Sequence, residues 1–600
     1  MKTSKCETMA TDTKVRKTQS TERRRVSKKE QPHPINKEAP YLAVTRRGKL
    51  KVFSLGGHGE VGKNMTVLEY GNDIIIIDCG VAFPQDEMLG IDLVIPDFTY
   101  LEQNKEKIRG IFLTHAHEDH VGSVPYLLKE MKAKLYGTKL TLGLVGNKLR
   151  EHGLFNQTET EVVAQGSTVN AGCFRVEFIR VNHSIADAVA FAITTPVGMV
   201  IHSGDFKVDF TPIQGEHIDL QRFGELGRRG VKLFLCESTN VLAKGYTMSE
   251  RSVGQMFERV FEQSPTQRLI IACFSSHIDR IQQVLHSAAQ YRRKVLFLGR
   301  SMVNAVKTAI ELGYLTAAPG LIIELSELRN YTDNQLVIIT TGSQGEPLAA
   351  LSRMAASDHR QIKITPSDKI IISAAPIPGN EILVSRVVNE LMKHGAEVIY
   401  EGLTEVHVSG HARQEELKLM HALVKPEFLV PVHGEFRHLI HHKDLAVSMG
   451  MPKENIFVME IGQVLEIGSR GAKITGTVPA GQILIDGIGI GDVGNVVLRD
   501  RKLLSEDGFI IVAVGVSMHD GGCQIVSGPD LISRGFVFVR ESDDLMSGAK
   551  SVVSDTLFEM EQKNTADKQY IKNKIKEDLR EYIWQKTKRN PMIFPILVEA

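Results

Sequence analysis

The sequence predicts an α/β protein with a sandwich of two sheets, an inserted parallel-sheet domain and a small C-terminal α+β domain. Three observations predict this fold class. Short β-branched runs separated by turn residues follow Lys49, strand-then-helix units repeat from about Arg268, and the polar strand ends of the first region return after residue 405. With 600 residues, of which 42% are hydrophobic and 24% charged, the chain has the length of roughly two to four globular domains.

The first region, residues 49–250, alternates strand-like runs with turns. Such runs, flanked by helical patterns, favour sheets packed face to face with helices outside. The expected strands are 50–55, 74–78, 108–114, 175–181 and 198–203, and the expected helices are 121–132 and 138–151.

The middle region, residues 251–404, changes to regular strand-then-helix alternation. That alternation predicts a parallel sheet flanked by helices. The expected strands are 268–273, 294–298, 336–341, 369–374 and 397–401, with helices near 277–293, 302–314, 347–356 and 380–394. Because residues 405–435 return to the chemistry of the first region, this domain is predicted to be inserted into the sandwich.

The end of the chain is predicted to form a connector and a separate domain. Residues 405–495 hold the second part of the sandwich and the connector, and residues 496–600 form the C-terminal domain. The stretch 484–500 is Gly-rich with short strands. The domain is expected to have strands at 508–517 and 534–540, a long polar helix at 543–586 and a final apolar run at 591–598.

The N-terminal segment is strongly basic although the whole chain is nearly neutral. Residues 1–50 carry fourteen Lys and Arg against five Asp and Glu, an excess of nine, so the formal charge of +1 leaves about −8 for the rest. The segment has few large apolar side chains, which predicts a disordered basic arm at 1–48. It either contacts nucleic acid or is a solvated tail without a role.

Cysteine use and hydropathy indicate a cytoplasmic protein. The six cysteines are scattered without a C-x-x-C pair, which argues against a disulfide framework and against a Cys-type zinc site. No stretch has the ~18 consecutive apolar residues that a membrane helix needs. The N-terminus lacks the apolar core of a secretory signal.

The strongest chemical signal is Thr-His-Ala-His-Glu-Asp-His at 114–120, directly after a predicted strand. His115 and His117 can approach one cation, and Asp119 and His120 can face a second. Imidazole and carboxylate ligands suit zinc, or manganese less tightly. The sequence therefore predicts a metal site with two ions at this strand end.

Further ligands are expected at the ends of other strands. His183 follows strand 175–181, Asp205 follows strand 198–203, and His433 follows the apolar run 427–432. Singly, each can be an ordinary structural residue. Together they supply a second-site histidine, a carboxylate able to bridge both ions, and a last histidine.

This arrangement resembles the metallo-β-lactamase superfamily, whose motifs lie at strand ends on one edge of an αββα sandwich. Asp78, at the end of strand 74–78, matches the first motif and is expected to orient ligands from the second shell. The insertion between Asp205 and His433, with Glu237, His411 and His433 as further motifs, is similar to the β-CASP nucleases. Within these, the chain is most similar to the ribonuclease J family over roughly residues 50–600. The matching stretches are Leu55–Asn64, Phe83–Asp92, 341–347, 407–411 and Asp486–Asp492.

The resemblance implies a metal-dependent ribonuclease with 5′-to-3′ exonuclease and endonuclease activity, acting in RNA maturation, including that of rRNA, and in mRNA decay. Two zinc ions, with manganese as an alternative, would lower the pKa of a shared water. Asp205 would bridge the ions and Asp119 would also orient the nucleophile. His411 would contact the phosphate or protonate the leaving oxygen. Glu237 would hold the tautomer of His411.

The resemblance also implies a pocket for an RNA 5′ monophosphate, formed by Phe274, Ser275, Ser276 and the loop from His407 through Val408, Ser409 and Gly410 to His411. The Ser pair could equally be a helix N-cap. This chain has Ser275, His277 and Asp279 where the family usually has Ala, Asn and His. A structural calcium near Gly90, Asp92 and Asp486 is implied as well, although Asp residues in Gly-rich loops are mostly turn formers.

Two other functions stay open at this point. A small-molecule metallohydrolase would need neither the inserted domain nor His411. A catalytically silent RNA-binding subunit would not need a complete set of ligands. The family resemblance further implies a homodimer or homotetramer that associates through the C-terminal region, with a helicase or the ribosome as candidate partners and no membrane association.

Overall fold

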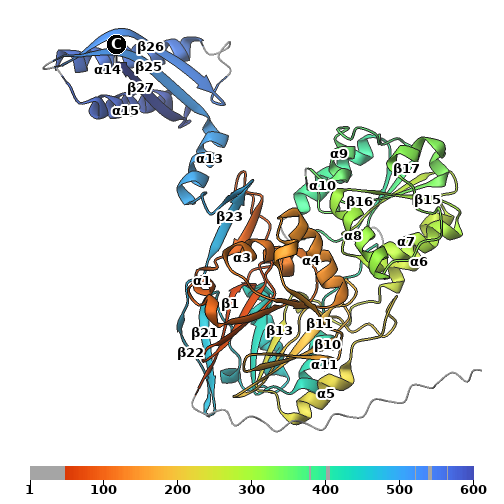
Figure 1. Ribbon diagram of the computed structural model, residues 1–600. Coiled ribbons are helices and arrows are strands. Elements are labelled where there is room, and N and C mark those ends of the chain that lie inside the picture. Colours follow the sequence, from red (N-terminus) through yellow and green to blue (C-terminus); the bar gives the residue numbers. More distant parts are fainter. Residues whose placement is uncertain are drawn as a thin grey trace, which may run out of the picture. The chain divides into compact units, whose positions relative to one another are not determined.

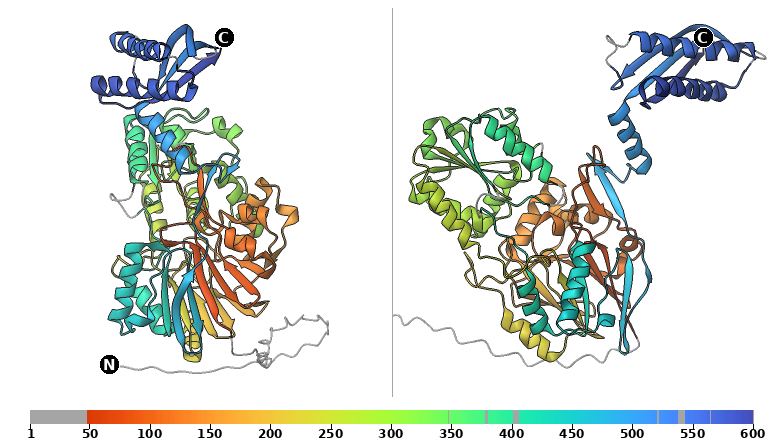
Figure 2. Two further views of the ribbon diagram at one scale, coloured as in Figure 1. Left: turned by 90° about the vertical axis from the view of Figure 1, so that its left-hand side faces the viewer. Right: turned by 180° about the vertical axis from the view of Figure 1, so that it is seen from behind.

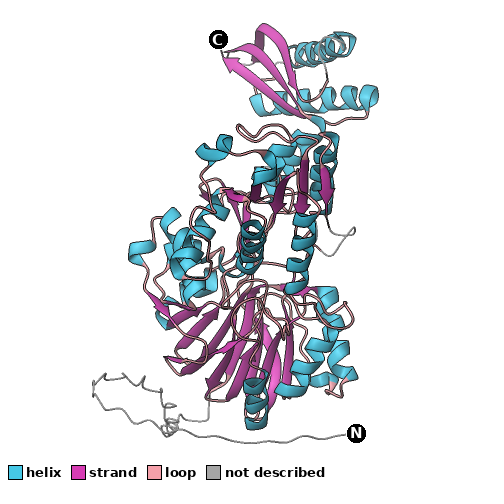
Figure 3. Ribbon diagram, turned by 90° about the vertical axis from the view of Figure 1, so that its right-hand side faces the viewer, coloured by secondary structure: helices cyan, strands magenta, loops and turns pink. Residues whose placement is uncertain are grey.

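The computed structural model describes residues 48–599 except 347, 378–379, 401–405, 520–521, 538–542 and 564. The predicted basic arm therefore lies outside the described residues, apart from Gly48. The predicted two-sheet sandwich is confirmed, and Figure 3 shows its two sheets face to face with helices outside them. None of the described helices is long and apolar enough to cross a membrane.

The first sheet of the sandwich has eight strands, and β1 and β3 pair antiparallel while β4 and β6 pair parallel. In sheet order the strands are β22 (Gly471–Thr477), β21 (Gln463–Gly468), β1 (Leu50–Gly56), β3 (Met65–Tyr70), β4 (Asp73–Ile77), β6 (Ile108–Phe112), β7 (Leu135–Gly137) and β8 (Thr160–Val162).

The second sheet has six strands, and its order matters for the site. The order is β19 (Phe428–Val432), β13 (Leu233–Glu237), β12 (Gly198–His202), β11 (Val189–Thr195), β10 (Phe174–Arg180) and β9 (Thr168–Ala171). Strand β19 follows the inserted domain yet pairs in parallel with β13. Residues on both sides of the insertion therefore build one sheet.

Alternating residues along the strands separate the core into layers. Phe112 of the first sheet meets Phe178 and Phe191 of the second between the two sheets. The outer face of each sheet packs against helices. The helices of the sandwich are α1 (Thr99–Gln103), α2 (Glu118–Val121), α3 (Val124–Glu130), α4 (Lys139–Glu151), α5 (Leu220–Arg229), α11 (Gln414–Val424) and α12 (Phe436–Ser448).

The inserted domain is the predicted parallel sheet. Its strands in sheet order are β15 (Lys294–Leu298), β16 (Leu336–Thr340), β14 (Arg268–Ala272), β17 (Asp368–Ile372) and β18 (Glu397–Ile399). Helices cover both of its faces (Figure 2), because Ile271 packs on one side while its neighbour Ile270 packs on the other. The helices are α6 (Arg251–Glu262), α7 (Ile278–Gln290), α8 (Arg300–Leu312), α9 (Ala350–Ala355) and α10 (Glu381–Lys393).

Short strands and one helix lead to the C-terminal domain (Figure 1). The strands are β24 (Gly489–Ile490), β23 (Gln482–Asp486) and β5 (Leu93–Pro96), with β2 (His58–Gly59) and β20 (Gly434–Glu435) paired elsewhere. The predicted connector 484–500 was wrong in its last part. Helix α13 (Asn495–Asp507) begins there, since the Gly-rich stretch ends at Gly494 and residues 498–504 are mostly Leu, Arg and Lys, which favour helix.

The C-terminal domain has a three-stranded sheet packed on two helices. Strand β25 (Phe509–His519) is central between β26 (Gly522–Arg534) and β27 (Met592–Glu599). The prediction of a strand at 534–540 was wrong at its start, because β26 forms a hairpin with β25 and ends at Arg534, while residues 538–540 lie outside the described residues. The single long helix was also wrong. The structure has α14 (Asp543–Gln562) and α15 (Lys568–Thr587), the latter capped by the Asp567 side chain.

One helix of the sandwich was likewise predicted too long. The pattern at 121–132 is divided between α2 and α3. The division occurs because the Ser123 amide donates to Cys79 O, while the Cys79 amide donates to His120 O. These contacts hold the short helix α2, which carries Asp119 and His120, against the end of β4.

Candidate metal centre

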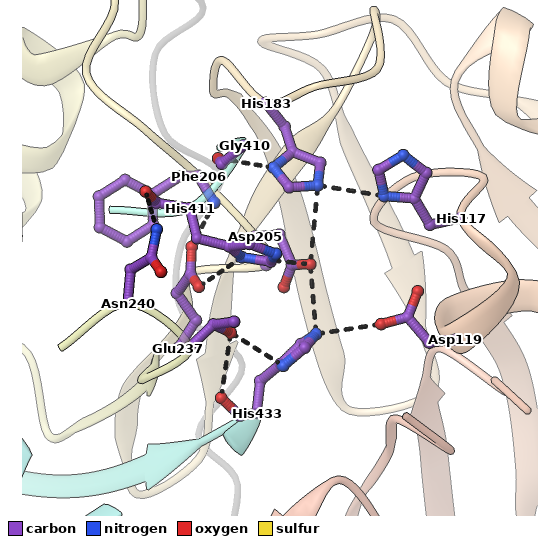
Figure 4. A network of polar contacts seen from close by, with 12 residues as sticks. His117, Asp119, His183, Asp205, Phe206, Glu237, Asn240, Gly410, His411 and His433 are labelled. Atoms are coloured by element: carbon purple, nitrogen blue, oxygen red, sulfur yellow. Dashed lines mark hydrogen bonds and ion pairs between the residues drawn. The ribbon is translucent and has the colours of Figure 1, made fainter. Parts of the chain in front are cut away.

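The predicted ligands meet where the strands of both sheets end. Asp78 follows β4, the 114–120 motif follows β6, His183 follows β10, Asp205 follows β12 and His433 follows β19. Figure 4 shows the side chains of His117, Asp119, His183, Asp205 and His433 converging from four of these segments. Two groups of potential ligand atoms form, and one carboxylate lies between them.

The first group consists of His115, His117 and His183. His117 Nδ1 lies 3.0 Å from His115 Nε2 and 3.1 Å from His183 Nε2. Ligand atoms that share an ion at about 2.0–2.1 Å are expected roughly 3–3.5 Å apart. Burial lowers the pKa of His117 to about 4 and holds the pKa of His115 and His183 well below the usual range. All three rings are therefore neutral, the form that binds a metal.

The second group consists of Asp119, His120, Asp205 and His433. His433 Nε2 lies 3.2 Å from Asp119 Oδ2 and 3.3 Å from Asp205 Oδ2. His120 Nε2 lies 3.1 Å from the same Asp205 oxygen. Burial would raise the pKa of Asp119, but His120 and His433 hold it well below the usual range. Both carboxylates in this group are ionised, which suits a cation.

Asp205 lies between the two groups. Its Oδ2 atom is 3.7 Å from His115 Nε2 and 3.8 Å from His183 Nε2, in addition to its contacts with His120 and His433. One oxygen is thus within 4 Å of ring nitrogens from both groups. A carboxylate in this position can bridge two ions.

His183 belongs to the first group and not to the second, where the sequence placed it. The strand order gives the reason. Strand β12, which Asp205 follows, pairs with β13 on one side and β11 on the other, and β10 lies beyond β11. His183 on the β10 side and His433 on the β19 side are therefore on opposite sides of Asp205.

Asp78 orients two residues of the 114–120 motif, as predicted. Its carboxylate accepts hydrogen bonds from the Thr114 amide and the Thr114 hydroxyl, both at 2.8 Å. It also lies 2.8 Å from His120 Nδ1. This contact leaves His120 Nε2 to face the second group.

Asn64 is a positioning residue to which the sequence analysis assigned no role. Its side-chain amide lies 3.3 Å from Asp119 Oδ2, 3.1 Å from Asp119 O and 3.2 Å from His120 Nε2. The chain passes close by at Gly80, where an added Cβ would lie only 1.6 Å from Asp119 O. Asn64 is the last residue of Leu55–Asn64, one of the stretches that carry the family resemblance, but nothing in the sequence links it to Asp119.

His58 and His202 were also missed. Both are buried, and burial lowers the pKa of each to about 4. They line a small cavity of about 10 Å³ behind His120 and Asp205, and neither ring nitrogen of His58 has a hydrogen-bond partner among the described residues. A cavity of this size has room for about one water.

Glu237 and His411 form a pair beside the first group. Glu237 Oε2 lies 2.8 Å from His411 Nδ1, and Glu237 Oε1 accepts a hydrogen bond from the Phe206 amide. Burial would lower the pKa of His411, but Glu237 raises it. His411 also lies near His183 and Asp205 as a possible ligand group. Its Nδ1 is the atom nearest to Asp205 and is already engaged by Glu237, which favours a role other than metal ligand.

Comparison with known proteins agrees with this geometry. Residues 58–207 match the metallo-beta-lactamase superfamily, 266–391 the ribonuclease J beta-CASP domain, 395–459 the Zn-dependent metallo-hydrolase RNA specificity domain and 496–600 the ribonuclease J C-terminal domain. Ribonuclease J2 of Bacillus subtilis is 42% identical over 92% of this chain and 99% of its own length. The chain belongs to the ribonuclease J family.

Two further similarities are consistent with this membership. Ribonuclease J 1 of Streptococcus pyogenes is 42% identical over 91% of this chain and 97% of its own length. A crystal structure of a protein of unknown function from Enterococcus faecalis covers 70% of this chain and 100% of its own, with a TM-score of 0.50 and 16% identity. This last likeness concerns the fold alone.

The two segments that the ribonuclease J resemblance assigns to the 5′ phosphate lie close together. The ring of His277, which follows Ser276, is parallel to His407 at 6.3 Å and lies 6.2 Å from His117 of the first metal group. Phe274–Ser276 follow β14, the middle strand of the sheet. Strands β15 and β16 lie on one side of β14, and β17 and β18 lie on the other. Parallel sheets bind ligands at such points, where the connections on the two sides run in opposite directions.

Ser275 and Ser276 are not helix caps. The N-cap of α7 is His277, and it makes no side-chain capping bond. Their hydroxyls, which are partly exposed, have no hydrogen-bond partner in the described part of the chain. Arg280, in contrast, is buried and is held by Glu250 and by Ser373 O.

The loop 407–411 approaches the metal ligands through its backbone. Gly410 O lies 2.8 Å from His183 Nδ1, and a Cβ at Gly410 would lie 2.5 Å from the same ring. Ser409 Oγ accepts hydrogen bonds from the Asn240 side chain and the His411 amide, while Val408 is buried. The loop therefore orients His183 as well as presenting His411.

The residues expected to bind calcium are otherwise engaged. Asp486 forms an ion pair with Arg501, whose guanidinium also lies against Gly90. Asp92 accepts a hydrogen bond from the Gly487 amide. Arg501 thus supplies a positive charge in the place where the sequence predicted a cation.

Proposed function

We propose that this chain is a metal-dependent ribonuclease that hydrolyses RNA phosphodiesters with two metal ions, with 5′-to-3′ exonuclease and endonuclease activity. The observation that carries the proposal is Asp205, whose Oδ2 atom lies within 4 Å of ring nitrogens from both histidine groups. Zinc suits the imidazole and carboxylate donors, and manganese is the alternative.

His115, His117 and His183 would hold one ion, and Asp119, His120 and His433 the other, with Asp205 shared. When bound, the two ions would lower the pKa of a water and stabilise charge on the attacked phosphate. The chain's own residues position both ions. Asp78 and Asn64 fix His120 and Asp119, and Gly410 O fixes His183.

His411 is proposed as the general acid. Because Glu237 accepts the Nδ1 proton, Nε2 is the nitrogen left for the substrate. Glu237 also raises the pKa of His411, which favours a ring that can give a proton to the leaving oxygen. Glu237 is a positioning residue in this scheme, since it acts through His411.

The direction of cleavage depends on how the 5′ end is held. The hydroxyls of Ser275 and Ser276, which have no hydrogen-bond partner among the described residues, lie next to Phe274 and near the 407–411 loop and are suited to a terminal phosphate. A 5′ monophosphate bound there would place the first internucleotide bond near His411, and an RNA threaded past the pocket would be cut internally. The related proteins named ribonuclease J support RNA as the substrate.

Several family properties are part of the proposal. We also propose, on the ground of family membership, roles in RNA maturation, including that of rRNA, and in mRNA decay. The same ground supports a cytoplasmic location, a homodimer or homotetramer, and association with a helicase or the ribosome. Calcium near Gly90, Asp92 and Asp486 is not included, because Arg501 already pairs with Asp486.

The two alternatives fit the site less well. A silent RNA-binding subunit would have no need for seven ligands held by a second layer of Asp78, Thr114 and Asn64. A small-molecule hydrolase would have no need for the Glu237–His411 pair or for the segment 274–277 beside it. Neither alternative explains why the inserted domain contributes residues next to His117.

The test compares four substrates of one sequence, namely RNA with a 5′ monophosphate, a 5′ triphosphate or a 5′ hydroxyl, and DNA with a 5′ monophosphate. Each is incubated with protein loaded with Zn²⁺ or Mn²⁺, and the products are mapped. We expect mononucleotides from 5′-monophosphate RNA and internal fragments from 5′-triphosphate RNA. Asp119→Ala should be inactive, while Asp358→Ala, at an exposed site, is the matched control. Equal cleavage by Asp119→Ala would contradict the two-metal mechanism.

A further inference from the structure

A separate cluster of metal-ligand side chains is buried in the sandwich, outside the candidate metal centre described above. Cys236 of β13, His421 of α11 and His442 of α12 each offer one ligand atom, and these atoms all lie within 4.8 Å of one another. Cys236 and His442 are fully buried, and His421 is 6% exposed. They lie in the layer where the outer face of the second sheet packs on α5, α11 and α12.

The contacts within this group have the form that a metal site requires. His421 Nε2 lies 2.9 Å from His442 Nε2, so both rings present the same nitrogen to one point. His442 Nδ1 lies 2.9 Å from Ser238 Oγ, a partner that fixes the ring orientation and leaves Nε2 for a ligand. The ring of Phe234 packs edge-on against His421 and closes one side.

The alternative is a plain hydrogen bond between two neutral imidazoles. That alternative accounts for the two nitrogens, but it does not account for a thiol at the same point. Neutral imidazole and thiol sulfur are the ligands that zinc and similar thiophilic cations select. We propose that Cys236, His421 and His442 bind a further metal ion of this class, with a structural role and separate from the two ions of the catalytic centre.

Electrostatics is compatible with this site. Burial lowers the pKa of His421 to about 4 and holds that of His442 well below the usual range, so both rings are in the ligand form. Burial, with the neighbouring Glu237 as a smaller cause, raises the pKa of the Cys236 thiol. A bound cation reverses this effect on a coordinating thiol, which loses its proton on binding.

The position of the group indicates what the ion does. Cys236 directly precedes Glu237, α11 follows the loop that ends in His411, and α12 follows His433. The ion would thus join the three elements that carry the general acid, its positioning residue and one catalytic ligand. It would fix these elements relative to one another from behind the catalytic layer.

The sequence could not reveal this site. The scattered cysteines, without a C-x-x-C pair, argued against a Cys-type zinc site, whereas the group proposed here combines one cysteine with two histidines. Cys236 is 185 positions before His421, so no motif spacing connects them. Only the pairing of β13 with β19 across the insertion brings α11 and α12 over Cys236.

Cobalt absorption tests the proposal, because thiolate bound to Co²⁺ gives a near-ultraviolet charge-transfer band that imidazole and carboxylate do not give. Metal-free full-length protein is titrated with Co²⁺ until the spectrum stops changing. The proteins compared are wild type, Cys236→Ala, His421→Leu and the control Cys173→Ala. Cys173 is a half-buried, unpaired cysteine that belongs to no metal-ligand group among the described residues.

We expect the band in wild type and Cys173→Ala, its loss in Cys236→Ala and at least a several-fold loss in His421→Leu. A saturated wild-type protein without the band would overturn the proposal, and so would a band that survives in Cys236→Ala. The wild-type result needs no substitution, so it stands even where a core variant fails to fold. An Asp119→Ala protein should keep the band, which separates this site from the catalytic centre and makes the test independent of the proposed function.

Discussion

Glu237 Oε2 and His411 Nδ1 are 2.8 Å apart although the two residues are 174 positions apart in the chain. Glu237 ends β13 before the inserted domain, and His411 follows that domain. The chain therefore leaves the site after Glu237, forms the inserted domain and returns to the site at His411. The pair is buried on the Glu237 side and partly open on the His411 side.

The first prediction concerns this pair. His411→Ala should lower kcat on the order of 10²-fold or more, as for a lost general acid, and should keep its metal. Glu237→Gln should lower kcat less, with little change in KM, since it acts through His411. The double variant should be no slower than His411→Ala alone, because the two substitutions remove one function. Effects that multiply in the double variant would show that Glu237 has a role independent of His411.

The second prediction concerns metal content. His183→Ala and His433→Ala should each lose about one ion per chain, measured by elemental analysis, because the two residues lie on opposite sides of Asp205. Asp205→Ala should reduce both ions. Asp219→Ala, which removes only the cap of α5, is the control and should keep its full content. Loss of the same single ion from His183→Ala and His433→Ala would place the two histidines in one group.

The candidate site was largely predictable from local sequence, and its internal arrangement was not. A strand followed by His115, His117, Asp119 and His120 identifies ligands without knowledge of the fold. The grouping of His183 depends on strand order, which no local pattern encodes. The roles of Asn64 and of the Cys236 group depend on contacts between distant segments in the same way.

The fold shows the same division. Regular alternation predicted the sandwich and the parallel sheet, because each pattern follows from the period of one element. The C-terminal domain was predicted less well. The hairpin of β25 and β26 and the break before Asp567 depend on which residues pair, so the start of the strand predicted at 534–540 and the single long helix were wrong.

The third prediction concerns Asp279, which lies in the first turn of α7. Burial, together with Glu250 and Asp209, raises the pKa of Asp279 to about 7 despite Lys207 nearby. The folded protein therefore keeps a proton that the unfolded chain loses near its ordinary value of 3.8. The contribution of this proton to the free energy of unfolding is fully present below pH 3.8 and is lost as the pH rises to about 7.

Asp279→Asn should remove this dependence. Its free energy of unfolding relative to wild type should rise between pH 5 and pH 8, by up to roughly 2.6 kcal/mol, since about two pH units separate pH 5 from the folded-state pKa of about 7. Thermal unfolding at several pH values measures the difference, and the exposed Asp358→Asn is the control. A constant difference between wild type and Asp279→Asn across this range would show that Asp279 does not titrate on unfolding.

The fourth prediction concerns the C-terminal sheet. Phe594, Ile596 and Val598 alternate along β27 on the face away from the helices, and they are 43%, 45% and 56% exposed. If chains associate through this domain, Ile596→Glu should shift the protein towards monomer in light scattering, as should truncation after about Asn495. Val162→Glu, at an exposed valine of β8, should leave the mass unchanged. An unchanged mass in both the Ile596 variant and the truncated protein would exclude this face.

The last prediction concerns the basic arm, which lies outside the described residues. Residues 1–48 carry thirteen Lys and Arg against five Asp and Glu, and these eight excess positive charges should attract RNA through release of counterions and without sequence preference. Deletion of residues 1–47 should weaken RNA binding at low salt and flatten the dependence of affinity on salt concentration. The metal ligands all lie beyond residue 114, so kcat at saturating RNA should stay nearly unaltered. Titrations of one labelled oligonucleotide at several salt concentrations measure both slopes. Equal slopes for the full-length and shortened proteins would favour an inert tail or a segment that binds a protein partner.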